Sequence, residues 1–157
     1  MEVLGQGGQG IVYRAQNPDL DDMDVAIKMP RTRGPRFRDG AGTKGSSRLE
    51  REKAAYVRLN HPNIARILDA GTHASRPYIV MEFVQGVRLR DRLRSASRGS
   101  EGDRLSTDEV VSICLHIARG LQHAHERQLV HRDLKPENGM IHDDGAVKIL
   151  DFGLVLL

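Results

Sequence analysis

Two charged motifs, each directly after a short apolar run, constrain the fold of this chain more than any other feature. Residues 131–138 have the sequence HRDLKPEN and follow the apolar pair 129–130. Residues 151–153 have the sequence DFG and follow the apolar run 147–150. Each apolar run thus leads straight into a charged motif, and residues 147–150 predict a strand that ends at the second one.

A glycine-rich segment near the start of the chain lies between two strand-like runs. Residues 5–10 have the sequence GQGGQG, with β-branched or apolar runs at 2–4 and 11–16, and a third run follows at 24–29. This pattern predicts consecutive antiparallel strands joined by turns. Its backbone amides can fold over phosphate oxygens, because glycine has no side chain to clash. The same glycine spacing opens dinucleotide-binding helices, but residues 11–13, Ile-Val-Tyr, favour a strand here.

The next part of the chain alternates a loop, a helix and two strands. Residues 31–47 are rich in glycine and basic residues and predict an exposed loop. Apolar residues at helical spacing predict a helix over 48–59, which Pro62 ends. Residues 64–68 and 78–84 predict strands. The first half therefore has five predicted strands and one helix.

A long helix is predicted in the second half of the chain. Residues 106–109, Ser-Thr-Asp-Glu, have the form of a capping box. Apolar residues then recur on one helical face: Val110, Ile113, Cys114, Ile117, Leu121 and Ala124. Cys114 is the single cysteine, so we expect a small buried apolar residue in a reducing compartment, with the cytoplasm as the expected location. The arginine-rich stretch 88–104 predicts a solvated helix and loop.

Length and composition exclude several classes of protein. The chain has 157 residues, of which 39% are hydrophobic, enough for a globular core. It has no apolar run of the length that spans a membrane and no signal-peptide pattern at Met1, so we expect a soluble protein with no membrane segment. The net charge is +3, but the arginines are scattered, so nucleic-acid binding is not predicted.

Taken together, the motifs resemble those of the protein kinase family. The resemblance rests on the motifs already described and on two more, VAIK at residues 25–28 and HPNI at residues 61–64. It runs from the first residues to the last. It implies an α+β, protein-kinase-like fold with a complete five-stranded amino-terminal lobe, its helix C, a hinge and the first part of a mainly helical carboxy-terminal lobe. The lobes are expected at 1–81 and 87–157, with the hinge at 82–86.

The resemblance implies roles for four catalytic residues. Lys28 is expected to clamp the α- and β-phosphates of ATP, and Glu52 to aim it, with Glu50 as the rival carboxylate. Asp133 is expected to accept or orient the proton of the substrate hydroxyl, while Lys135 balances charge on the transferred group. His131 is expected to pack, together with Phe152 and Tyr56, rather than to act as a base.

The cofactors implied by the resemblance are ATP and Mg²⁺. Asn138 and Asp151 are the expected magnesium ligands, because this ion prefers hard oxygen donors. The nucleotide is expected to contact the glycine-rich segment, the two lobes and the hinge. The residues expected to bind it are Gly5, Gln6, Gly7, Gly8, Gln9, Gly10, Val12, Ala26, Lys28, Met81, Glu82, Val84 and Met140.

The implied activity is transfer of the ATP γ-phosphate to serine or threonine hydroxyls of proteins. Lys135, two residues after the catalytic aspartate, is typical of the serine/threonine form, and the motifs resemble the eukaryotic-like kinases of bacteria. Only four residues follow Gly153, so we expect the activation segment and the later helices of a kinase domain to be absent from this chain. The alternative is therefore a truncated, catalytically silent fragment that binds ATP or a partner. A small-molecule phosphotransferase is disfavoured by the form of residues 134–137.

Overall fold

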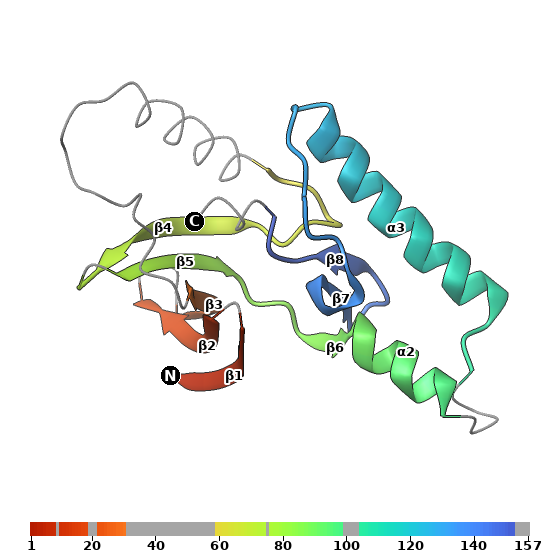
Figure 1. Ribbon diagram of the computed structural model, residues 1–157, viewed down its shortest axis with the longest axis horizontal. Helices are drawn as coiled ribbons and strands as arrows, with labels where there is room; N and C mark the ends of the chain where they lie inside the picture. Colours follow the sequence, from red (N-terminus) through yellow and green to blue (C-terminus); the bar gives the residue numbers. More distant parts are fainter. Residues whose placement is uncertain (9, 19–21, 31–58, 75, 99–103, 153–157) are drawn as a thin grey trace. The chain divides into compact units, whose positions relative to one another are not determined.

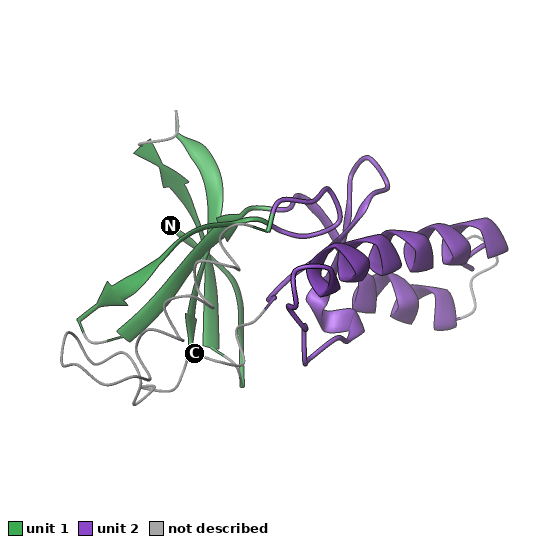
Figure 2. Ribbon diagram, turned by 90° about the horizontal axis from the view of Figure 1, so that it is seen from above, with its two compact units in different colours: residues 1–59, 66–83, 156–157 green, residues 60–65, 84–155 purple. Residues whose placement is uncertain are grey.

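The computed structural model describes residues 1–8, 10–18, 22–30, 59–74, 76–98 and 104–152 (Figure 1). The chain divides into two compact units, the first from residues 1–59 and 66–83 and the second from residues 60–65 and 84–155, as far as these are described (Figure 2). The lobe and hinge boundaries expected from the sequence remain a prediction. The predicted loop at 31–47 and the predicted helix, apart from Leu59, lie outside the described residues.

Unit 1 is built on an antiparallel sheet of five strands, as the sequence predicts. The strand order is β1-β2-β3-β5-β4, so β3 lies at the centre (Figure 1). Buried Val25 and Ala26 on β3 and Ile79 on β5 contribute to its core. The strands are β1 (Glu2–Gly7), β2 (Gly10–Asn17), β3 (Met23–Pro30), β4 (Ile67–His73) and β5 (Arg76–Glu82).

The predicted bounds of the fourth and fifth strands are wrong. β4 begins at Ile67, and β5 ends at Glu82. The physical reason for the first shift is that Ile64, 2% exposed, belongs to the core of unit 2 and makes isolated bridges to His61 and Ile149. Its apolar run therefore serves two cores, which strand periodicity does not distinguish.

Unit 2 combines a small sheet with two helices. Its strands β6 (Gly86–Arg88), β7 (Gly139–His142) and β8 (Val147–Ile149) pair in the order β6-β7-β8 (Figure 1). The helices are α2 (Leu89–Ser97) and α3 (Thr107–His125), and a single 3-10 turn, η2 (Pro136–Asn138), precedes β7. Among the described residues, no helix has the length and apolar character that crossing a membrane requires.

The predicted capping box of α3 is confirmed. The Ser106 hydroxyl accepts from the Glu109 amide at 3.1 Å, and the Glu109 carboxylate accepts from the Ser106 amide at 2.8 Å. Arg92 of α2 donates to the same carboxylate at 3.1 Å. The start of α3 is therefore fixed by its own cap and by α2.

The expectation that Cys114 is buried is wrong. Cys114 is exposed, as is Val110 on the same predicted face, whereas Gly120 and Ala124 are buried. The reason is that the buried residues of α3, Gly120 and Ala124, lie in its second half, where a Cβ atom on Gly120 would lie 2.9 Å from the Asn63 carbonyl oxygen and 3.0 Å from the Ile149 side chain. His116 also bonds to β8, because its Nδ1 accepts from the Val147 amide at 3.3 Å.

Candidate active site

Four of the predicted nucleotide-binding residues share one face of the sheet in unit 1. Val12 pairs directly with Lys28, and Ala26 pairs directly with Met81. Directly paired residues of an antiparallel sheet point to the same face, and so do residues two apart on one strand. Lys28 and Ala26 are two apart on β3, so both pairs lie on one face.

Lys28 is almost completely buried, with 4% of its surface exposed. An ordinary surface lysine keeps its ammonium in water, because removing this charge from water is costly. Its burial on β3, the central strand of the sheet, therefore sets it apart from a solvated side chain. Glu52, its expected partner, lies outside the described residues, as does the rival Glu50.

The glycine-rich segment forms the connection between β1 and β2. Gly5 and Gln6 belong to β1 and pair with Val12 and Ile11, while Gly7 pairs with Gly10 across the turn. A Cβ atom on Gly7 or Gly8 would meet nothing within 4 Å, whereas one on Gly10 would lie 2.3 Å from the Met29 carbonyl oxygen. The turn is therefore open at Gly7 and Gly8, and of these three glycines Gly10 is the one that close packing requires. Gln9 lies outside the described residues.

The end of β5 carries the residues expected at the hinge. The Glu82 amide donates to the Arg66 carbonyl at 2.8 Å, and the Glu82 carboxylate accepts from the Arg66 amide at 3.2 Å. Met81 is buried with 6% of its surface exposed. The other two expected adenine-binding residues, Val84 and Met140, belong to unit 2, where Met140 pairs with Arg88 and Lys148.

Asp133 is the centre of a polar cluster in unit 2. The Lys135 ammonium donates to its carboxylate at 2.7 Å. The Asn138 side-chain amide donates to the Asp133 carbonyl at 2.9 Å and to its carboxylate at 3.2 Å. The turn η2, with Pro136 at its start, brings Asn138 back toward Lys135, whose carbonyl accepts from the Asn138 amide at 2.9 Å. Three of the predicted site residues are thus brought together.

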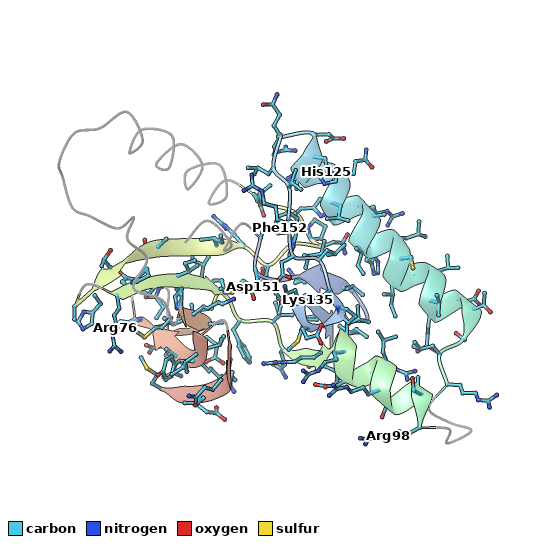
Figure 3. The ribbon with its side chains drawn as sticks, viewed as in Figure 1. Arg76, Arg98, His125, Lys135, Asp151 and Phe152 are labelled. Carbon is cyan, nitrogen blue, oxygen red and sulfur yellow. The ribbon has the colours of Figure 1, made fainter. Side chains whose placement is uncertain are left out.

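Asp151 follows a residue that is bonded to this cluster. The Leu150 amide donates to the Asn138 carbonyl at 2.7 Å, so the chain enters Asp151 directly beside Asn138. Lys135, Asp151 and Phe152 are labelled in Figure 3. The two predicted magnesium ligands therefore belong to adjoining segments of unit 2.

His131 links the two charged motifs. It is 2% exposed, its Nδ1 accepts from the Asp133 amide at 3.3 Å, and its Nε2 lies 2.9 Å from the Leu150 carbonyl oxygen. With Nδ1 as the acceptor, Nε2 carries the proton and donates to Leu150. The ring also packs edge-on against Phe152, with ring centroids 4.7 Å apart. The expected packing of His131 against Phe152 is confirmed, while Tyr56 lies outside the described residues.

Two residues of the charged motifs have backbone conformations that the sequence does not predict. Arg132 has φ 66° and Asp151 has φ 60°, in the left-handed region that non-glycine residues rarely occupy. Such conformations cost about 1–3 kcal/mol each and concentrate at functional sites. The surrounding bonds of His131 and Asn138 hold them in place.

Sequence reasoning gave no role to Asn63 of the HPNI motif. Its side-chain amide donates to the Val147 carbonyl at 2.9 Å, and its own carbonyl accepts from the Ile149 amide at 2.9 Å. A Cβ atom on Gly120 would lie 2.9 Å from the same Asn63 carbonyl, so α3 approaches this segment closely. Asn63 therefore holds β8, the strand that leads to Asp151. The available signal in the sequence was an asparagine between two apolar residues, Pro62 and Ile64.

The side-chain oxygens of Asn138 and Asp151 fit a hard cation. The Asn138 side-chain nitrogen is the donor in both bonds to Asp133. The oxygen of this amide is therefore the atom that can coordinate a metal ion. Together with the carboxylate of Asp151, it provides the oxygen donors that Mg²⁺ prefers, with remaining positions for water and phosphate.

Comparisons with known proteins agree with this geometry. The model of the protein kinase domain family matches residues 1–156. The chain is 36% identical over 151 residues to the probable serine/threonine-protein kinase PknB of Lactococcus lactis, covering 96% of this chain. It is also 36% identical over 154 residues to the serine/threonine-protein kinase PrkC of Bacillus subtilis, covering 98% of this chain.

A solved structure shows the same fold. The crystal structure of the kinase domain of Mycobacterium tuberculosis PknI, determined on a point mutant, matches with a TM-score of 0.79 and 27% sequence identity, covering 98% of this chain and 58% of that one. The chain spans 22% of the length of PknB and of PrkC. The kinase-like α+β fold predicted from the sequence is thus confirmed. This chain belongs to the protein kinase domain family.

Proposed function

We propose that this chain is the nucleotide-binding and catalytic part of a serine/threonine protein kinase, which transfers the γ-phosphate of ATP to serine or threonine hydroxyls of a protein. The observation that carries the proposal is the cluster of Asp133, Lys135 and Asn138, which the Leu150–Asn138 bond joins to Asp151. It combines a carboxylate, an ammonium and oxygen donors, the groups that phosphoryl transfer requires.

The shared face of the unit 1 sheet is proposed to bind the nucleotide. Lys28 would bind the α- and β-phosphates, as the corresponding lysine does in protein kinases. The adenine ring would contact the apolar side chains that share this face with Lys28, which are Val12, Ala26 and Met81. Val84 and Met140 are also proposed to contact the ring. The backbone of the segment from Glu82 would bind the edge of the base, and the open turn at Gly7 and Gly8 would cover the phosphates. Glu52 is the proposed carboxylate partner of Lys28.

The cluster around Asp133 is proposed to perform the transfer. Asp133 would accept the proton of the substrate hydroxyl. The oxygen of that hydroxyl bonds to the γ-phosphorus of ATP while the bond between the γ-phosphorus and ADP breaks. Lys135, 2.7 Å from the Asp133 carboxylate, would place positive charge beside the transferred group. The two bonds from Asn138 fix the carboxylate before the substrate arrives. His131 then keeps a structural role, because both of its ring nitrogens are bonded to the backbone.

Asn138 and Asp151 are the proposed ligands of Mg²⁺. When bound, this ion neutralises charge on the phosphate oxygens. The names of the relatives support a serine/threonine acceptor. The cytoplasm remains the expected compartment, since a single free cysteine suits a reducing environment.

Transfer of labelled phosphate tests this proposal. The chain is incubated with Mg²⁺, ATP labelled at the γ-phosphate and a mixture of dephosphorylated proteins, and the labelled amino acids are separated after acid hydrolysis. We expect label on serine and threonine, reduced by about a hundredfold or more in Asp133→Asn, because the general base is lost. The control is Asp143→Asn, an exposed aspartate between β7 and β8.

Two results would contradict the proposal. Equal transfer by wild type and Asp133→Asn would remove Asp133 from the chemistry. Binding of Mg-ATP without any transfer would identify the chain as the silent nucleotide-binding fragment that the sequence left as the alternative.

A further inference from the structure

Arg14 has no assigned role in nucleotide binding, yet it lies on the face that carries Lys28. It pairs directly with Ala26, which in turn pairs with Met81. Its guanidinium carbon lies 4.7 Å from the centre of the Phe83 ring. It also forms an ion pair with Asp24. Arg14 therefore joins β2 and β3 to the residue that directly follows β5.

The sheet register explains how one side chain reaches both partners. Val25 pairs with Glu82 at the end of the β3–β5 ladder, so Asp24 and Phe83 are the next residues on either side. Asp24 is two residues from Ala26 and therefore shares the face of Arg14. A long side chain spans such a diagonal distance in a sheet. The Arg14 side chain thus extends from the Arg14–Ala26 pair to the end of the β3–β5 ladder, where Asp24 and Phe83 lie.

The contact fits a positioning role better than a stabilising one. The side chains of Arg14 and Asp24 are 41% and 33% exposed, and ion pairs with this exposure contribute little to stability. A guanidinium held by a carboxylate, however, presents its flat face to an aromatic ring in a defined orientation. The geometry therefore fixes the Phe83 ring more than it stabilises the fold.

The segment at Phe83 is held from the other side as well. Glu82, its neighbour, is bonded through both its amide and its carboxylate to the backbone of Arg66 on the β4 side. Arg14 acts from the β2–β3 side. The backbone of residues 82 and 83 is thus fixed between these two contacts.

We propose that Arg14 is a positioning residue for the purine base: by holding Phe83 it fixes the backbone that receives adenine. The inference rests on the proposed function, because it uses the assignment of this segment as the adenine-binding one. It adds a residue outside the recognised motifs, and the charge of Arg14 acts on Phe83 rather than on the phosphates.

Two ligands separate an effect of Arg14 on binding of the base from an effect on binding of the phosphates. Adenosine contains the base without phosphates, and Mg-ATP contains both. The affinity of the full chain for each is measured by titration in wild type, Arg14→Gln and Arg14→Lys. The control is Arg76→Gln, an exposed arginine at the opposite end of β5 (Figure 3). Thermal melting confirms that each variant is folded.

We expect Arg14→Gln to lower the affinities for adenosine and for Mg-ATP by the same factor, about three- to tenfold, because the variant loses one cation–π contact that orders the binding segment. Arg14→Lys should recover part of this loss, since an ammonium keeps the charge over the ring but not the planar fork. Phe83→Leu should cause a similar loss, and the double variant with Arg14→Gln should lose no more, because the two residues act as one unit. Arg76→Gln should bind as wild type does.

Other results would overturn the inference. Weaker Mg-ATP with unchanged adenosine would mean that Arg14 acts on the phosphates, and unchanged affinity for both would mean that it has no role in binding. Lys28→Met serves to test the proposed function separately: it should weaken Mg-ATP and leave adenosine unchanged. If Lys28→Met changes neither ligand, the nucleotide assignment of this face fails, whatever Arg14 does.

Discussion

The side-chain amide of Asn138 donates to both the carbonyl and the carboxylate of Asp133, at 2.9 and 3.2 Å. One asparagine therefore fixes the backbone and the side chain of the same aspartate. It also leaves the amide oxygen of Asn138 as the atom that can bind a cation. The orientation of the proposed base and that of a proposed magnesium ligand are thus one structural feature.

The first prediction concerns this asparagine. Asn138→Ala removes both bonds to Asp133 and the amide oxygen, so we expect phosphate transfer to fall about 10- to 100-fold or more, as when partners that orient a metal site are removed. The concentration of Mg²⁺ for half-maximal transfer should rise. Asn60→Ala, an exposed asparagine of the same unit, is the control. An Asn138→Ala variant with the magnesium dependence of wild type would show that the amide is not a ligand.

His131 gives a prediction about stability. Replacing it by alanine removes two hydrogen bonds and a buried ring packed against Phe152, and should lower the free energy of unfolding by about 2–4 kcal/mol. Urea denaturation measures this difference. His125→Ala, at the exposed end of α3 (Figure 3), should change the value by less than about 0.5 kcal/mol. Similar values for the two variants would contradict the account of His131.

A third prediction concerns pH. Burial lowers the pKa of His61, and the nearby His123, Arg127, Arg119 and Lys148 lower it further. The two histidine rings lie with centroids 4.8 Å apart. Because the folded pKa lies below the unfolded value of about 6.5, the unfolded chain binds the proton more readily. At pH values above about 6.5, His61 is neutral in both states and the free energy of unfolding is at its full value. As the pH falls below this value, the unfolded chain takes up the proton first, so the free energy of unfolding decreases.

Thermal melting between pH 8 and pH 5 measures this effect. The melting temperature of wild type should fall on acidification by more than that of His61→Phe, which retains a ring but does not titrate. A steeper fall in His61→Phe than in wild type would mean that protonation of His61 is favoured in the folded state.

Two glycines of the same turn give a fourth prediction. Gly10 has φ 142°, and a Cβ atom there would lie 2.3 Å from the Met29 carbonyl oxygen, whereas one at Gly8 would meet nothing within 4 Å. Gly10→Ala should therefore lower the free energy of unfolding by about 1–3 kcal/mol, and Gly8→Ala by less than about 0.5 kcal/mol. Chemical denaturation of both variants compares them directly. Equal losses would contradict the register of β2 against β3.

Local signals in the sequence predicted the elements that local interactions form. The first three strands follow from apolar runs and glycines, and the start of α3 follows from the Ser106–Glu109 cap, whose bonds join residues three apart. The predictions that were wrong concern residues whose environment depends on contacts with distant parts of the sequence. Ile64 pairs with Ile149, so it joins unit 2 instead of β4. Cys114 is exposed, whereas the buried residues of α3, Gly120 and Ala124, lie further along the helix.

The same distinction holds for the candidate site. Its motif residues were predictable because their chemistry and spacing resemble one family, and the structure brings Asp133, Lys135 and Asn138 together within one short segment. The strand β6 was not predicted. Gly86 at its start has φ 144°, and a Cβ atom there would lie 2.0 Å from the Ile141 carbonyl oxygen. Only the position of β7 makes that glycine necessary.

Whether Lys28 and Asp151 bind the nucleotide and its metal ion is decided by the affinity of the folded chain for Mg-ATP, determined by titration calorimetry in wild type, Lys28→Met and Asp151→Ala. We expect saturable binding by wild type and an affinity lower by about tenfold or more in each variant, because each loses a charged contact worth about 1.5–3 kcal/mol. Unchanged affinity in both variants, with their folds intact, would contradict this expectation.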